Sequence, residues 1–316
     1  MRRKYGRVQL GLSLQVQRAL FQQAVPAAGS YASEVWGLRK LTGAARKGRA
    51  RLSTLHVQFL KNLLHLPRSV ATNLVFRELG VQPLELGWLR GTLRLYNQLA
   101  HAPAHSLHGA VVRADWEDAC VHNIKNWAWG LREYLRQLGW ALPRDGHVLP
   151  ELDARVIMNA AKAREQACWQ GLSECPRTCP TAHASLCKYD RWFAPRPGPR
   201  LGSNPYVTLN LGLSRVLKII KFRLGCHQLP IVALRNNNVP RAQRLCVKCA
   251  SGALGDEQHL LFECPFVACV RAHFAHLFTP GCTMLEFMQQ PGICGVACFI
   301  LACLKLYLAP TVPNVP

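Results

Sequence analysis

Acidic residues are scarce in this sequence: 17 Asp and Glu stand against 39 Lys and Arg, a formal net charge of +22 with a pI of about 9.9. Such a surface is unsuited to cationic partners, and its like charges repel one another, which destabilises the compact state. The charge therefore favours a polyanion as partner, either a nucleic acid or an anionic membrane surface, over a surface that is basic only for solubility.

A long apolar run is absent as well. Residues 1–15 have a basic head with no apolar run behind it, so they do not resemble a secretory signal. The most membrane-like stretch, residues 293–309, contains Lys305 and barely reaches the thickness of a bilayer, which favours a buried C-terminal helix. We expect an intracellular protein, in the nucleus or the cytoplasm, with no membrane partner.

Sequence signatures of catalysis are missing too. There is no adjacent pair of aspartates, no phosphate-binding glycine loop, no HExxH helix and no GxSxG turn. We therefore expect a protein that is not an enzyme on its own and that has no small-molecule substrate.

Helical periodicity is what the sequence does contain. Apolar residues recur at helical spacing and almost never in strict alternation, which predicts a mainly α fold. In detail we expect an irregular helical region, a small Cys-Cys-His-Cys zinc module and a C-terminal helix. The expected helices cover residues 52–66, 84–100, 115–139 (with Asp115 as N-cap), 151–169 and 213–229.

Composition shifts along the chain suggest five segments. Residues 171–206 are rich in Pro and Gly and form the best candidate for a linker. The segments are a basic N-terminal part over 1–51, a helical region over 52–170, the linker over 171–206, a basic helix with the zinc module over 207–280, and a C-terminal helix and tail over 281–316.

The most specific motif is C-x2-C-x9-H-x4-C within residues 244–265. Three thiolates and one imidazole can close a tetrahedron around zinc, and Gly252 and Gly255 suit the tight loop between the pairs. Asp256 is placed to cap a short helix that carries the histidine. The expected zinc ligands are Cys246, Cys249, His259 and Cys264. Four protein ligands leave no position for water, so the site is expected to be structural even though Asp256 and Glu257 could mimic a zinc hydrolase.

Other arrangements of the 14 cysteines remain open. The motif could consist of buried free thiols and a surface histidine. A second group is spaced four residues apart, but Pro176 and Pro180 forbid a regular helix there: Cys175, Cys179, His183 and Cys187. The later cysteines are expected to be small apolar fillers of C-terminal helices: Cys269, Cys282, Cys294, Cys298 and Cys303.

The helix expected from residue 213 is amphipathic. Its apolar residues are predicted to point inward: Leu213, Val216, Leu217, Ile220 and Leu224. Its basic residues fall on or beside the wet side, where they suit a phosphate backbone as well as they suit a solvated face. Together with residues around the zinc module, the expected phosphate contacts of RNA or DNA are Arg215, Lys218, Lys221, Arg223, Arg241, Arg244 and Lys248.

Several stretches resemble one family. The pattern RxCxxC followed by DEQHLLFECP, with Arg271 and Phe274 in the next helix, is similar to the Cys-rich C-terminus of LINE-type (non-LTR) retrotransposon reverse transcriptase polyproteins. Upstream, residues 31–37 (YASEVWG), 55–69 and 78–90 resemble the helical region that follows the palm of these polymerases.

The resemblance implies a post-palm helical region joined to a zinc module. The paired palm aspartates that hold magnesium have no counterpart here, and neither has the endonuclease. The sequence thus predicts a nucleic-acid-binding, zinc-stabilised, non-catalytic remnant of such a polyprotein. The alternatives are a zinc-bearing protein-interaction module and an accessory portion of an RNA-directed DNA polymerase that acts with a palm supplied in trans.

Overall fold

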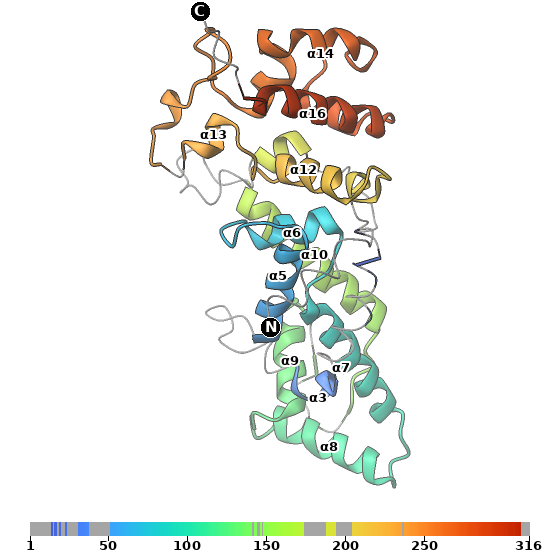
Figure 1. The fold of residues 1–316 in the computed structure, drawn as a ribbon. Helices are drawn as coiled ribbons and strands as arrows, with labels where there is room; N and C mark the ends of the chain where they lie inside the picture. Colours follow the sequence, from blue (N-terminus) through green and yellow to red (C-terminus); the bar gives the residue numbers. More distant parts are fainter. Residues whose placement is uncertain are drawn as a thin grey trace, which may run out of the picture. The chain divides into compact units, whose positions relative to one another are not determined.

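The computed structural model describes residues 31–37, 51–140, 142–143, 146, 148–173, 188–193, 204–235 and 237–310, with the separate positions 14, 16, 17, 19 and 23. The described part is mainly helical and contains no strand, which confirms the predicted fold class (Figure 1). The chain divides into two compact units. Unit 1 comprises Met1–Gln17, Leu60–Val81 and Leu172–Pro316, and unit 2 comprises Arg18–Phe59 and Gln82–Gly171.

Unit 2 is a helical bundle around one apolar core. Its helices are α3 (Ser33–Trp36), α7 (Leu84–Ala100), α8 (Leu107–Cys120), α9 (Trp127–Gln137), most of α5 (Arg51–Leu63) and most of α10 (Ala154–Ser173). Tyr96 and Trp116 are fully buried in the core with ring centroids 5.6 Å apart. The Tyr96 hydroxyl donates to the carbonyl of Pro150 at 2.8 Å, so burial leaves its polar end satisfied.

One expected helix is in fact two. The helix predicted over 115–139 was wrong, because α8 starts earlier, at a Ser106 cap whose hydroxyl accepts from the N–H of Gly109. Asn123 then takes a left-handed conformation (φ 52°) after the end of α8, and Asn126 caps α9 by accepting from the N–H of Trp129. Asp115 therefore lies inside α8 instead of capping a helix.

Unit 1 carries the Cys/His motif. Its helices before the motif are α6 (Thr72–Leu79), η1 (Pro205–Thr208), α12 (Leu213–Arg223), α13 (Pro230–Ala233) and η2 (Arg241–Gln243). Those in and after it are η3 (His259–Glu263), η4 (Pro265–Val267), α14 (Ala268–His273), η5 (Ala275–Leu277), α15 (Met284–Gln289) and α16 (Ile293–Leu308). Residues 188–193, within the stretch expected to be a linker, are helical, and their Tyr189 and Phe193 belong to the core of this unit.

Helix α16 lies between α12 and α14 in unit 1 (Figure 1). Its buried residues include Phe299, Ile300 and Tyr307, which confirms the expected buried C-terminal helix. None of the helices in the described residues combines the length and the apolar character that crossing a membrane requires.

The core of unit 1 contains a buried ion pair. Arg223 Nε donates to Glu78 Oε1 at 2.7 Å, and both side chains are at most 1% exposed. The Tyr189 hydroxyl donates to the other carboxylate oxygen at 2.6 Å, and Arg223 Nη2 donates to the carbonyl of Phe193 at 3.2 Å. This placement corrects the prediction that Arg223 contacts phosphate, because its guanidinium is enclosed and already bonded.

We expect acid to destabilise unit 2 through His56 of α5. This side chain is 2% exposed, and burial lowers its pKa from 6.5 to about 4. The unfolded chain therefore binds a proton at this histidine more readily than the folded chain does. The free energy of unfolding is unaffected by His56 above about pH 6.5, and it decreases as the pH falls from about 6.5 to about 4. The loss should amount to about 3 kcal/mol.

Thermal unfolding of the full chain across that pH window measures the effect. His56→Gln should flatten the profile between these pH values, whereas the exposed His108→Gln should leave it unchanged. Identical pH slopes for His56→Gln and the unaltered chain would contradict this assignment.

Candidate metal centre

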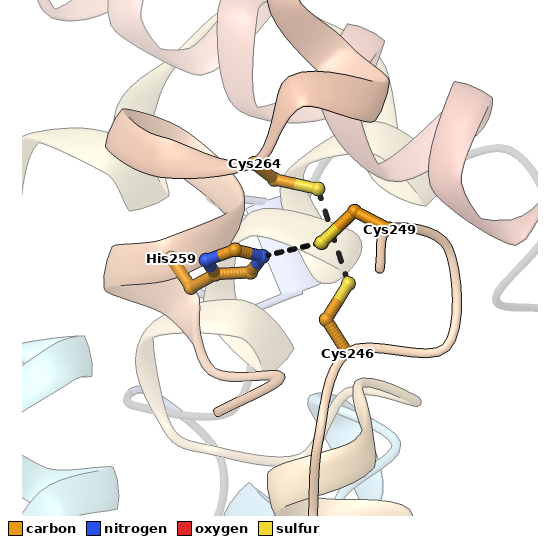
Figure 2. Close-up of side chains that lie close together, drawn as sticks. All are labelled: Cys246, Cys249, His259 and Cys264. Atoms are coloured by element: carbon orange, nitrogen blue, oxygen red, sulfur yellow. Dashed lines mark hydrogen bonds between the residues drawn. The ribbon is translucent and has the colours of Figure 1, made fainter. Parts of the chain in front are cut away.

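The four side chains of the C-x2-C-x9-H-x4-C motif meet at one point in unit 1. Their ligand atoms all lie within 4.8 Å of one another. Cys246 Sγ is 3.9 Å from Cys264 Sγ, and Cys249 Sγ is 3.2 Å from His259 Nε2 (Figure 2). Tetrahedral zinc with bonds of about 2.3 Å to sulfur separates two thiolates by about 3.8 Å. The group could hold a metal ion, as the sequence predicted.

A tight loop presents the first two cysteines. The Cys246 N–H donates to the carbonyl of Ala253 at 2.8 Å, and the Gly255 N–H donates to the carbonyl of Arg244 at 2.9 Å. Gly252 has a φ of 67°, a left-handed conformation that glycine adopts without strain. Gly255 is needed for a different reason: a Cβ there would lie 2.7 Å from Pro230.

A short helix presents the other two ligands. Asp256 Oδ1 accepts from the N–H of His259 at 3.0 Å, which confirms the expected cap. The turn that follows, η3, is a π-helix, and its last bond joins the Cys264 N–H to the carbonyl of His259 at 2.7 Å. In a π-helix each hydrogen bond joins residues five positions apart, and His259 and Cys264 are such a pair. The wider turn therefore brings these two residues to the same side of the helix.

Residues other than the four ligands surround the ligand atoms, and the sequence did not single them out for this role. The Tyr307 hydroxyl of α16 lies 3.4 Å from Cys246 Sγ, and the Ser251 hydroxyl lies 3.1 Å from Cys249 Sγ. Arg271 Nη2 donates to the carbonyl of Cys264 at 2.7 Å. Glu263 Oε2 is 3.4 Å from His259 Nδ1, without the geometry of a hydrogen bond. Such neighbours orient ligands and tune a bound metal.

The thiols differ in acidity. Burial alone would raise the pKa of Cys249, but hydrogen bonds from Ser251, Cys246 and His259 outweigh burial and lower that pKa to about 6. Burial raises the pKa of Cys264 to about 12. A metal ion that binds all three thiolates must therefore displace a proton from Cys264, which makes binding weaker in acid.

The acidic neighbours of the motif are committed to structure. Glu257 is fully buried and pairs with Lys188, and its Oε1 also accepts from His227 Nε2 at 2.6 Å. Burial alone would raise the Glu257 pKa, but the interactions with His227 and Lys188 outweigh it and lower that pKa to about 2. Asp256 caps the helix. Neither carboxylate is placed as the free base of a zinc hydrolase.

The basic residues expected to contact phosphate fall into three groups. Arg215, Lys218 and Arg241 are exposed, and Lys221 is half-buried. Arg244 and Lys248 are half-buried and already donate to backbone carbonyls: Arg244 Nε to Val239 at 2.8 Å, Lys248 Nζ to Ala309 at 3.0 Å. Arg223 is buried against Glu78. The predicted stripe on α12 is thus shorter than the sequence suggested.

The remaining cysteines are a mixed set. Cys303 is buried, as expected for an apolar filler, and Cys282 and Cys298 are half-buried. The prediction was wrong for Cys269 and Cys294, which are exposed. The alternative group at residues 175–187 lies outside the described residues.

Comparisons with known proteins add no family to this picture: no protein-family model, no curated protein and no solved structure matches the chain.

Proposed function

We propose that the Cys/His group is a structural zinc site. Three thiolates and one imidazole are the donor set that zinc prefers in closed, four-coordinate sites. The Sγ–Sγ separation of 3.9 Å is close to the value for tetrahedral zinc. Zinc would supply charge neutralisation for the three thiolates and would tie the Cys246 loop to the helix that carries His259.

We further propose that unit 1 binds RNA or DNA through phosphate contacts. The observation that carries this is the charge of the stretch that leads into the Cys/His motif: no Asp or Glu occurs between Asp190 and Asp256, while Lys and Arg recur throughout that stretch. Of these, Arg215, Lys218 and Arg241 are exposed. Contacts of this kind give affinity without strong sequence preference.

The resemblance to the C-terminal part of non-LTR retrotransposon polyproteins fits this role. A post-palm helical region with a zinc module has to hold a template without carrying the catalytic aspartates. We therefore propose a nucleic-acid-binding, zinc-stabilised and non-catalytic remnant of such a polyprotein, located in the nucleus or the cytoplasm.

Salt dependence tests the phosphate contacts. Binding of a short single-stranded RNA, measured by fluorescence anisotropy, should weaken linearly on a log–log scale as salt rises. The Arg215→Gln/Lys218→Gln double variant should bind about tenfold more weakly and should reduce the salt slope by about 1–2.

Arg136→Gln is the matched control, because Arg136 is an exposed arginine of unit 2 that pairs with Glu133. It should leave both affinity and slope unchanged. A protein-interaction module would show little salt dependence.

Magnesium-dependent primer extension by the purified chain would overturn the non-catalytic assignment.

A further inference from the structure

Unit 1 contains a cavity that the zinc site does not use. Its volume is about 640 Å³, within the range of roughly 300–1,000 Å³ that ligand pockets occupy. Three parts of the chain line it: residues 67–74, residues 224–227 directly after α12, and residues 232–244. Every lining residue belongs to unit 1.

The residues that line this cavity include both apolar and basic side chains. Leu74, Val232 and Val239 supply apolar surface, and Arg235 and Arg244 supply positive charge. No Asp or Glu lines the cavity, and in the described part of the chain no carboxylate pairs with either arginine. An occupant that combines a flat apolar group with an anion would match both kinds of lining residue.

The two guanidinium groups differ in how they are held. Arg244 is fixed by Nε donating to the carbonyl of Val239 at 2.8 Å and Nη1 donating to the carbonyl of Ile231 at 3.2 Å, and these two bonds leave one Nη1 hydrogen and both Nη2 hydrogens as donors. Arg235 acts electrostatically on Cys226, which also lines the cavity. Burial raises the pKa of Cys226 to about 11, against the opposing charges of Arg235, Lys221 and Lys61. Three cations therefore lie near this thiol.

The rim adds a group suited to a base edge. Asn238 is exposed, and its carboxamide can both donate and accept hydrogen bonds. It has a φ of 57°, a left-handed conformation that asparagine adopts readily in turns.

We propose that this cavity binds one nucleotide unit, with the base against the apolar lining residues and the phosphate on the guanidinium groups of Arg235 and Arg244. The choice of a nucleotide rests on the proposed nucleic-acid binding, because the lining residues in 224–244 belong to the same acid-free stretch as the exposed basic residues. The nucleotide comes either from the end of a bound strand or from a free nucleoside monophosphate.

Alkylation of Cys226 reports whether the cavity is occupied, because this side chain is part of the lining. The zinc-loaded full chain is treated with excess iodoacetamide at about pH 9, where only about 1% of a thiol with a pKa of about 11 is ionised, and the slow rate of alkylation of the Cys226 peptide is followed by mass spectrometry. The probes are adenosine monophosphate, inorganic phosphate, and a short RNA with either a 5′-phosphate or a 5′-hydroxyl. We expect adenosine monophosphate or the 5′-phosphorylated RNA to protect Cys226, and the one that protects identifies the source. No protection by either, or equal protection by inorganic phosphate, overturns the proposal.

Two variants separate the cavity from the exposed basic face. Arg235→Gln should weaken nucleotide affinity at least about tenfold, because a charge-assisted hydrogen bond to phosphate is lost. Ser69→Trp places an indole at an exposed lining position without changing the core, and should abolish protection. The Arg215→Gln/Lys218→Gln variant should keep protection by adenosine monophosphate. Unchanged nucleotide affinity in both cavity variants overturns the proposal.

The same experiment distinguishes this inference from the proposed function. Protection by adenosine monophosphate in a chain that fails to bind RNA leaves the cavity site standing and removes the nucleic-acid role. Salt-dependent RNA binding without protection of Cys226 by any probe leaves the nucleic-acid role standing and removes the cavity site.

Discussion

The Cys246→Ser/Cys249→Ser variant is expected to lose zinc and to unfold residues 240–280. Apparent binding free energies of structural zinc reach about 10–16 kcal/mol in small modules, so this is the largest effect that we predict. The unfolding should extend to α16, because the Tyr307 hydroxyl lies 3.4 Å from Cys246 Sγ and Lys248 donates to the carbonyl of Ala309. Chelation of the unaltered chain should have the same effect.

Metal content and hydrogen exchange measure this outcome. The unaltered chain should carry one zinc ion at the motif, and cobalt substitution should show charge-transfer absorption from three thiolates. Exchange of backbone amides in 240–280 and in α16 should become fast in the variant. The exposed Cys294→Ser serves as the control and should keep both metal and protection. Full metal content with unchanged protection in the double variant is incompatible with a zinc site at these residues.

The second large effect concerns the Glu78–Arg223 pair. Arg223→Met should cost about 3–5 kcal/mol, because it leaves the Glu78 carboxylate buried without its cation. The Tyr189 hydroxyl, at 2.6 Å from Oε2, compensates only in part. Glu78→Gln should cost a similar amount. The Glu78→Leu/Arg223→Met double variant should recover most of the loss, because no uncompensated charge remains.

A double-mutant cycle by denaturant unfolding provides the measurement, and the neighbouring pair provides the control. Arg77 lies beside Glu78 on α6 and pairs with Asp190, but the side chains of Arg77 and Asp190 are 16% and 24% exposed. Arg77→Met should therefore cost less than Arg223→Met, because solvent reaches the charge that is left behind. Additive losses in the Glu78–Arg223 cycle would show that the two charges do not depend on each other.

Local signals predicted much of the site correctly. The spacing of Cys246 and Cys249 is typical of a turn, and the position of Asp256 three residues before His259 is typical of a helix cap. Both pairs of ligands are therefore presented by short-range structure. Helix α7 has the bounds 84–100 that its apolar period predicted, because a regular period over that length is a strong signal. The same period was misleading over 115–139, where the Asn123 turn interrupts an otherwise helical pattern.

The sequence by itself therefore determined the mainly helical fold, the four-residue Cys/His group and the excess of basic charge, because each depends on composition or on neighbours along the chain. Only the tertiary structure decided which basic residues remain exposed. Arg223 follows the helical period of α12, but its partner Glu78 is 145 positions away in the sequence. Tyr307 lies 61 positions from Cys246. Contacts at such separations arise from packing, and no local pattern encodes them.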